Sequence, residues 1–537
     1  EDRALNDGAR EFDYIVVGAG SAGSVIANRL TESGKYSVLL LEAGVKSHFW
    51  SSIPVGFAKL IDNPAANWLY DAEPEPNTDG RRIPVPRGKL LGGSSSINGM
   101  VFVRGQSHDF DHWAQLGNRG WSYQDVLPFF KKLETFEGGE SALRGGSGPI
   151  KVKVNQERGP LVDAIFSACN EIGVPTNRDY NGAEQDGIGI TQASINGGRR
   201  MSTARCYLRP AEKRANLTIE TKALARRLLF DAKRCTGVRY AIEGIEREAV
   251  AAREVIVSSG SINSPQLLEL SGIGRADVLQ AHGIDVVHEL AGVGENLRDH
   301  YAPRMKWTIT QRGVTYNDNM RGLGLVREGL RYLVSREGFL ASSAGPIRAY
   351  LRSREGLVSP DIGLSFSAFL MTPQFALAKE PGLTGIGHQL RPESQGTIHL
   401  KSPDPTIAPA INFNFLSAEL DRQVTLACVR LTRQIIETTA MDEYRGVELA
   451  PGKDVQSDDE VIDWVKRTAE TTYHPIGTCK MGSDPMAVVD ERLRVHGIED
   501  LRVADASIMP TLTSGNTNAP SIMIGEKAAS MLLEDAA

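Results

Sequence analysis

Residues 12–30 read FDYIVVGAGSAGSVIANRL, and the rest of the architecture can be worked out from them. The apolar run at 12–17 is rich in β-branched residues, which is typical of a short buried strand. Glycines at 18, 20 and 23 follow at once in a GxGxxG pattern, and the residues after them have helical spacing. A strand, a glycine-rich turn and a helix in this order predict an α/β unit that holds a dinucleotide.

Each part of this pattern has a physical role. Gly18 permits the tight turn, Gly20 lets the backbone approach a pyrophosphate, and Gly23 lets the helix pack closely on the strand. The helix N-terminus presents its partial positive charge to the phosphates. A second apolar run, Val38–Leu41, ends on Glu42, an acid suited to accept hydrogen bonds from an adenosine ribose. The acid argues against a ribose bearing a 2′-phosphate, but the pattern alone does not separate NAD from FAD.

Bulk properties narrow the class of protein. The chain has 537 residues, 41% of them hydrophobic, and a formal net charge of −6. This length predicts two domains, and the absence of a basic run disfavours nucleic acid as a partner. The five cysteines form no CxxC pair, so the sequence predicts no metal site, and reduced thiols in a cytoplasm are expected. No apolar stretch reaches the roughly 18–20 residues of a transmembrane segment.

Several longer motifs resemble the glucose–methanol–choline (GMC) family of flavin oxidoreductases, in one order along nearly the whole chain. Besides the N-terminal pattern they are GKLLGGSSSING at 88–99, GSINSPQLLELSGIG at 260–274, GENLRDH at 294–300, YHPIGTCKMG at 473–482, LRVADAS at 501–507 and NTNAP at 516–520. Among the subgroups of the family, the resemblance is to the choline dehydrogenase type, which GRRMSTAR at 198–205 also fits.

The resemblance implies the cofactor FAD and the residues that bind it. It implies the pyrophosphate near 18–21, the ribose on Glu42, the flavin ring and ribityl chain against 92–98, and Ala223 beside the adenine. The full expected set is Gly18, Gly20, Ser21, Ala22, Glu42, Ala43, Gly92, Gly93, Ser94, Asn98, Gly99, Ala223, Asp505, Ala506 and Asn516. Choline oxidase, a member of this family, carries a flavin-linked histidine where this chain has Ile97. We therefore expect FAD to be held non-covalently.

The C-terminal motifs suggest the chemistry. Oxidation of an alcohol removes a proton from the hydroxyl and a hydride from its carbon. The resemblance implies His474 as the general base, because an unperturbed imidazole titrates near neutrality, with hydride transfer to the flavin N5. It implies Asn518 as a fixed donor that polarises the substrate oxygen. Asn518 cannot accept a proton, which leaves His474 as the base of the pair. Asp299 and His300 are expected to brace the chain near the flavin.

The middle of the chain predicts a second domain. Residues 361–370, 396–401 and 410–415 have strand-like patterns, and a helix is expected from Ala418 to Thr439, capped by Ser417. The fold class is therefore α/β: a Rossmann-like FAD-binding domain and a second α+β substrate domain whose antiparallel sheet covers the flavin. The expected boundaries are 11–302 with 475–537 for the first and 303–474 for the second. A lid-like loop is expected at about 45–87, and Met100, Phe102 and Tyr473 as walls of the substrate pocket.

These expectations combine into one function with alternatives. We expect FAD-dependent oxidation of a primary alcohol to an aldehyde, and the subgroup resemblance favours a dehydrogenase. An oxidase of the same family that uses O2 is the alternative, and a hydroxynitrile lyase with non-redox FAD is the alternative from another class. The expected partners are a small-molecule alcohol and either O2 or a quinone-like acceptor. A quinone acceptor is compatible with peripheral membrane association of a cytoplasmic protein. The alcohol and the oligomeric state stay open.

Overall fold

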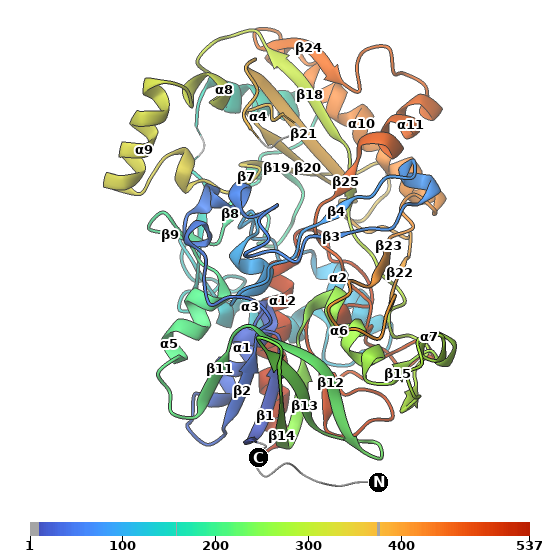
Figure 1. The fold of residues 1–537 in the computed structure, drawn as a ribbon. Helices are drawn as coiled ribbons and strands as arrows, with labels where there is room; N and C mark the ends of the chain where they lie inside the picture. The colour runs from blue at the N-terminus through green and yellow to red at the C-terminus, as the bar shows by residue number, and fades with distance from the viewer. Residues whose placement is uncertain (1–9, 157, 373–375) are drawn as a thin grey trace.

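The computed structural model describes residues 10–156, 158–372 and 376–537 (Figure 1). Two large sheets organise the molecule, one of seven strands in the lower half of the view and one of six strands in the upper half. The helices α1 (Ser21–Thr31) and α12 (Asn518–Asp535) pack against each other in the lower half. Segments from both ends of the chain therefore build the lower half together.

The seven-stranded sheet has the order β11-β2-β1-β14-β13-β12, and β26 also pairs with β14. Its strands are β1 (Arg10–Val17), β2 (Val38–Leu41), β11 (Leu217–Glu220), β12 (Ala223–Asp231), β13 (Arg234–Ile242), β14 (Ile245–Val257) and β26 (Leu501–Val503). The strands β11, β2, β1, β14 and β26 pair in parallel, whereas β12 and β13 pair antiparallel. All four residues of β2 are buried, as is usual in a parallel sheet covered on both faces.

The strand–turn–helix–strand unit predicted for residues 12–42 is confirmed. Gly18 has φ +102°, and a Cβ atom there would lie 2.4 Å from the carbonyl oxygen of Ser258. A Cβ atom on Gly23 would lie 1.9 Å from the carbonyl oxygen of Gly18. Both positions therefore require glycine, the first for its backbone conformation and the second because α1 starts directly against the turn.

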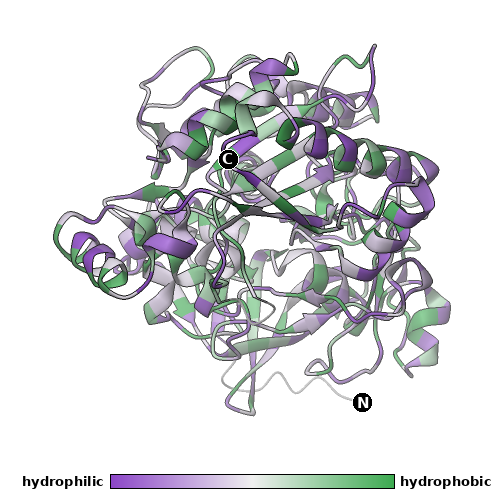
Figure 2. Ribbon diagram, turned by 90° about the horizontal axis from the view of Figure 1, so that it is seen from above, coloured by the Kyte–Doolittle hydropathy of each residue, from purple (hydrophilic) through white to green (hydrophobic). Residues whose placement is uncertain are grey.

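The six-stranded antiparallel sheet has the order β24-β18-β21-β20-β19-β7. Its strands are β7 (Gly187–Ile190), β18 (Arg304–Ile309), β19 (Ile347–Leu351), β20 (Ile362–Ser367), β21 (Gly382–Gln389) and β24 (Arg445–Ala450). One face packs on α4 (Pro160–Glu171), α10 (Glu419–Ile436) and α11 (Asp458–Thr468) through a second hydrophobic core. In the view from above, hydrophilic and hydrophobic residues follow one another along the helices (Figure 2), as is usual for helices with one face in a core and the other in solvent.

The upper half differs from the sequence-based expectation in three details. β7 and α4 contribute to its sheet and core although both lie outside 303–474, a boundary that itself stays a prediction. The strands expected at 396–401 and 410–415 form a separate pair, β22 (Thr397–His399) and β23 (Ala410–Asn412). The cap assigned to Ser417 is wrong, because Ala418 takes the N-cap position of α10 with extended backbone angles.

The segment 45–87, expected to be a lid, contains short regular elements. They are the 3₁₀ helices η1 (Phe49–Ser52), η2 (Pro54–Lys59) and η3 (Pro76–Thr78) and the strand pair β3 (Tyr70–Asp71) and β4 (Pro84–Val85). Tyr70 and Val85 are buried in the second hydrophobic core. This part of the segment is therefore anchored to the upper half of the molecule.

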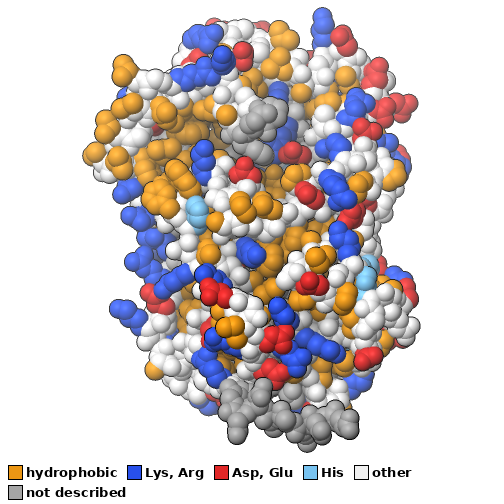
Figure 3. All heavy atoms as spheres, in the orientation of Figure 1, with side chains coloured by type: hydrophobic (Ala, Val, Ile, Leu, Met, Phe, Trp, Pro, Cys, Tyr) orange, Lys and Arg blue, Asp and Glu red, His pale blue; other side chains and the backbone are white. Residues whose placement is uncertain are grey.

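The helix α9 (Leu323–Ser335) projects from the upper left of the molecule (Figure 1). Its outer face is apolar, with Leu323 exposed by 88% and Val334 by 85%. Figure 3 shows hydrophobic side chains gathered on this edge. Within the described ranges, none of the helices combines the length and the apolarity that a membrane crossing requires.

Candidate active site

A cavity of about 680 Å³ is lined by residues from both large sheets. Its volume lies within the roughly 300–1,000 Å³ that is usual for cofactor and ligand sites. Fourteen of the fifteen predicted cofactor residues line it: Gly18, Gly20, Ser21, Ala22, Glu42, Ala43, Gly93, Ser94, Asn98, Gly99, Ala223, Asp505, Ala506 and Asn516. Gly92 is not in the wall. Its N–H donates to the carbonyl of Ala19 at 2.7 Å, so it joins the two glycine-rich loops.

At the nucleotide end, the groups present fit FAD. Glu42 is buried, and its carboxylate accepts the N–H groups of Gly44 at 2.8 Å and Ala19 at 3.2 Å. Burial raises the pKa of Glu42 to about 7, so further donors such as ribose hydroxyls would stabilise its ionised form. α1 begins after Gly20, which has no side chain to cap the helix. The free N–H groups of the first turn therefore suit a pyrophosphate.

The loop expected to face the flavin is held by a buried cation. Arg200 donates from Nη1 to the carbonyl oxygen of Asn98 at 2.6 Å and to its Oδ1 at 2.7 Å. Its Nε donates to the carbonyl of Ser51 at 3.1 Å. Burial lowers the pKa of Arg200 to about 9. Arg200 thus fixes Asn98 in the cavity wall, a role that sequence reasoning did not assign.

Two other predicted cofactor residues also support the backbone. The N–H of Ala223 donates to the carbonyl of Glu42 at 2.8 Å, which ties the start of β12 to the end of β2. The carboxylate of Asp505 accepts the N–H of Gly260 at 2.9 Å and the hydroxyl of Ser264 at 2.6 Å. Asp505 therefore fixes the start of α6 (Gly260–Leu270) at the cavity wall.

At the other end of the cavity, the imidazole of His474 is held on both ring nitrogens. Nδ1 lies 3.0 Å from Nδ1 of His300 and 2.8 Å from the hydroxyl of Thr472. Nε2 lies 2.9 Å from Nδ2 of Asn516. The backbone N–H of His474 donates to Asp299 at 2.9 Å, and that of His300 donates to the same carboxylate at 2.7 Å. The expected bracing role of Asp299 and His300 agrees with these contacts.

These contacts determine which nitrogen of His474 carries the proton. Nε2 of His300 lies 2.9 Å from the carbonyl oxygen of Leu390, which can only accept, so this nitrogen must donate. In a neutral ring, Nδ1 of His300 is then an acceptor, and Nδ1 of His474 donates to it. Nε2 of His474 is therefore the unprotonated nitrogen, and its lone pair accepts a hydrogen bond from the amide group of Asn516.

Electrostatics keep both imidazoles neutral. The pKa of His474 lies well below its ordinary value of 6.5, because of burial first and then the neighbouring His300, His388, Arg87 and Arg348. Burial also lowers the pKa of His300 to about 4. The site consequently presents an unprotonated Nε2 at neutral pH.

The two asparagines of the C-terminal motif have exchanged places relative to the sequence-based expectation. Asn516, expected at the cofactor, is the amide beside His474. Asn518, expected as the catalytic donor, is the first residue of α12, and its Oδ1 accepts the hydroxyl of Ser21 at 2.8 Å. The assignment of Asn518 as the donor facing the base is therefore wrong. Its contact lies at the start of α1, where the phosphates of FAD are expected.

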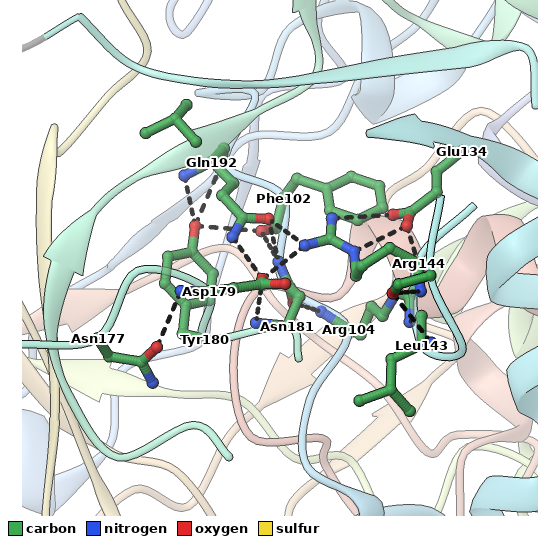
Figure 4. A network of polar contacts seen from close by, with 12 residues as sticks. Phe102, Arg104, Glu134, Leu143, Arg144, Asn177, Asp179, Tyr180, Asn181 and Gln192 are labelled. Carbon is green, nitrogen blue, oxygen red and sulfur yellow. Dashed lines mark hydrogen bonds and ion pairs between the residues drawn. The ribbon is translucent and has the colours of Figure 1, made fainter. Parts of the chain in front are cut away.

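Of the predicted pocket walls, Met100 and Tyr473 line the cavity and Phe102 does not. Phe102 is buried in the first hydrophobic core, and its carbonyl accepts the side-chain amide of Asn181 at 3.0 Å. Figure 4 shows it beside the buried ion pairs of Glu134 with Arg104 and Arg144, at 2.6 and 2.8 Å. The assignment of Phe102 to the pocket is wrong because its ring packs in the first hydrophobic core and is buried there.

The sequence predicted that a sheet of the second domain covers the flavin, but it identified none of the side chains that the upper sheet contributes to the cavity. These lining residues are Arg304, Lys306, Arg348, Ser365, Ser367, Thr384, Ile386 and His388. A signal was present in β18, where charged residues at 304 and 306 alternate with the apolar Met305 and Trp307. Such alternation is typical of a strand with one face in the core.

Comparison with known proteins gives a consistent picture over the length of the chain. The GMC oxidoreductase family models match residues 12–302 and 392–525. An oxygen-dependent choline dehydrogenase of Brucella suis is 43% identical, over 97% of this chain and 96% of its own. Pyridoxine 4-oxidase from Mesorbium loti superposes with a TM-score of 0.88 at 29% identity, over 97% and 99%. Formate oxidase of Aspergillus oryzae superposes with 0.92 at 27%, over 99% of both chains.

Proposed function

The chain belongs to the GMC oxidoreductase family, and on this premise we propose that it oxidises a primary alcohol to an aldehyde with His474 as the general base. It is an FAD-dependent oxidoreductase that acts on CH–OH groups. The observation that carries the proposal is the unprotonated Nε2 of His474 in the cavity wall, 2.9 Å from the amide of Asn516. When bound, FAD supplies the hydride acceptor at N5 of its flavin ring.

The protein's own residues handle the proton. We assign the substrate hydroxyl to a position within hydrogen-bond reach of both Nε2 of His474 and Nδ2 of Asn516, where it replaces their direct contact of 2.9 Å. Nε2 takes the hydroxyl proton, and Asn516 donates to the oxygen as negative charge develops on it. The hydrogen bond from Nδ1 of His474 to His300 keeps the ring in the tautomer that can accept this proton. The bond of the His474 backbone to Asp299 fixes the loop that carries the base.

Two further features of the proposal concern the cofactor and its acceptor. Ile97 lines the cavity at the position of the flavin-linked histidine and has no nucleophile, so we propose non-covalent FAD. The named relatives include a dehydrogenase described as oxygen-dependent and two oxidases. We therefore keep a dehydrogenase as the leading form and an O2-using oxidase as the second. None of these relatives is a lyase, so that alternative gains no support.

Anaerobic reduction of the bound flavin tests the proposal. Holoenzyme is mixed without oxygen with aliphatic, aromatic and amino alcohols, and bleaching of the flavin is followed by absorbance. Aldehyde formation with O2 or a quinone-like dye then identifies the acceptor. His474→Ala should slow bleaching by about 10²–10⁴ while flavin content is unchanged, because a positioned base contributes that much. A variant that bleaches at the wild-type rate would refute the role of His474.

A panel in which no alcohol bleaches the flavin would refute the proposed function itself. The matched control is His282→Ala. His282 is outside the cavity and contacts the carbonyl of Leu400 at 2.9 Å, so its removal leaves the site intact. Loss of activity in both variants would point to a general defect in folding.

A further inference from the structure

The cavity-facing surface of the six-stranded sheet is polar and basic. In β18, Met305 and Trp307 pack in the second hydrophobic core, whereas Arg304 and Lys306 line the cavity. In the neighbouring strands, too, one set of side chains packs in the second hydrophobic core and the alternate set lines the cavity. The sheet therefore separates an apolar core from a polar wall. The nucleotide-binding loops and His474 line the same cavity as this wall.

The register of the strands orders these side chains into rows. Arg304, Ile386, Ser365 and Arg348 face one another across β18, β21, β20 and β19. Lys306, Thr384 and Ser367 form the next row. His388 follows on β21, and neither of its ring nitrogens has a hydrogen-bond partner. Hydroxyl and imidazole side chains of β20 and β21 thus lie between the basic residues of β18 and that of β19.

Acids balance only part of the positive charge on this wall. Arg304 pairs with Glu470 at 2.6 Å. Lys306 and Arg348 form no ion pair within the described ranges, and Nε of Arg348 is buried without a hydrogen-bond partner. The other acids that line the cavity in the described part of the chain are Glu42 and Asp505, both in the nucleotide-binding half. Unpaired cations in a cavity wall suit an anionic ligand, because charge-assisted hydrogen bonds are strong when partly desolvated.

We propose that the alcohol oxidised by this protein carries an anionic group, such as a carboxylate, which Lys306 and Arg348 bind while its CH–OH group lies at His474. The inference rests on the proposed function and deepens it by naming the substrate class. It also separates this chain from the choline dehydrogenases to which it is similar. A quaternary ammonium would lie among unbalanced positive charges, which select against it.

Three matched alcohols test the inference on the holoenzyme. They are 4-(hydroxymethyl)benzoate, the neutral isostere 4-(hydroxymethyl)benzamide, and the cationic 4-(aminomethyl)benzyl alcohol, with choline as a fourth. We expect kcat/KM to be at least about tenfold higher for the benzoate than for the benzamide, since a hydrogen bond to a charged group contributes at least that factor. The cationic alcohols should be the poorest substrates. Higher kcat/KM for the benzamide, or for choline, would overturn the inference.

Variants identify the groups responsible. Lys306→Gln and Arg348→Gln should each reduce the benzoate-to-benzamide ratio about tenfold. Lys453→Gln is the matched control, because it removes an exposed lysine outside the cavity and should leave the ratio unchanged. Binding of 4-methylbenzoate, which cannot be oxidised, is measured by calorimetry and should weaken in the same two variants.

The outcomes separate the inference from the proposed function. Oxidation of the benzamide without preference for the benzoate leaves the alcohol oxidase or dehydrogenase assignment intact and refutes the anionic substrate. If the Lys306 and Arg348 variants shift the flavin reduction potential but not the benzoate-to-benzamide ratio, these two side chains act on the cofactor. That result would also refute the anionic substrate. Bleaching by none of the four alcohols, together with 4-methylbenzoate binding, would refute the proposed function alone.

Discussion

Replacing Asn516 or Asn518 by alanine should have different consequences although the two residues are neighbours in the sequence. Asn516 donates from 2.9 Å to the nitrogen that we assign as the base, so it faces the oxygen on which charge develops. Loss of one such donor costs about 2.7–4 kcal/mol of barrier, or about 10²–10³ in turnover. Asn516→Ala should therefore reduce kcat by that factor and leave FAD binding unchanged.

Asn518→Ala should mainly affect the cofactor. The lost contact is a neutral hydrogen bond of 2.8 Å to the hydroxyl of Ser21 at the start of α1. A bond of this kind contributes about 0.5–1.5 kcal/mol, which corresponds to about 2- to 13-fold in the dissociation constant of FAD. Turnover of the FAD-saturated variant should stay within a few-fold of the wild type.

Two measurements separate these outcomes. Single-turnover reduction of the flavin at saturating alcohol and FAD reports the chemical step, and fluorescence titration of the apoprotein with FAD reports affinity. Equal loss of the reduction rate in both variants would refute the assignment of Asn516 as the donor. A large loss of the reduction rate in Asn518→Ala with a small loss in Asn516→Ala would refute it as well.

Three further predictions concern the base and the cofactor. His300→Phe removes the acceptor that holds the Nδ1 proton of His474, so kcat should fall about tenfold or more in single-turnover assays; an unchanged rate would contradict the tautomer argument. Because His474 acts unprotonated and its pKa is lowered, kcat/KM should be constant from pH 8 to 6.5 and fall only at lower pH; a midpoint above 6.5 in the pH profile would contradict this. With Ile97 in the flavin-facing loop, acid precipitation should release all yellow colour into the supernatant, and a yellow pellet would indicate a covalent bond.

Local patterns predicted the parts of the site that depend on backbone shape. The GxGxxG turn and Glu42 follow from strand, turn and helix signals within one short stretch, and the family resemblance pointed to the proposed FAD site and to His474 as the proposed base. Asn516 and Asn518 could not be distinguished in this way. Which of the two faces the base depends on where α12 begins, and that start is set by packing against α1, hundreds of residues away in sequence.

The basic wall of the cavity was missed for a related reason. Arg304, Lys306 and Arg348 are ordinary surface-type residues when each strand is considered separately. They become one wall only through the register of β18, β21, β20 and β19. The alternation within a strand predicts two faces, but it does not indicate which of them borders a ligand.

The layout of the lower sheet has a consequence for biosynthesis. β14 pairs with β1, which is synthesised early, and with β26, which is synthesised much later. Glu526 of α12 is fully buried and pairs with Arg29 of α1 at 2.8 Å. A nascent chain on the ribosome therefore exposes the apolar surface of α1 until residues 501–535 emerge. Such late, long-range pairing slows folding and exposes intermediates to aggregation. Loading of FAD is accordingly expected to follow the synthesis of residues 501–535, which complete the sheet and the cavity.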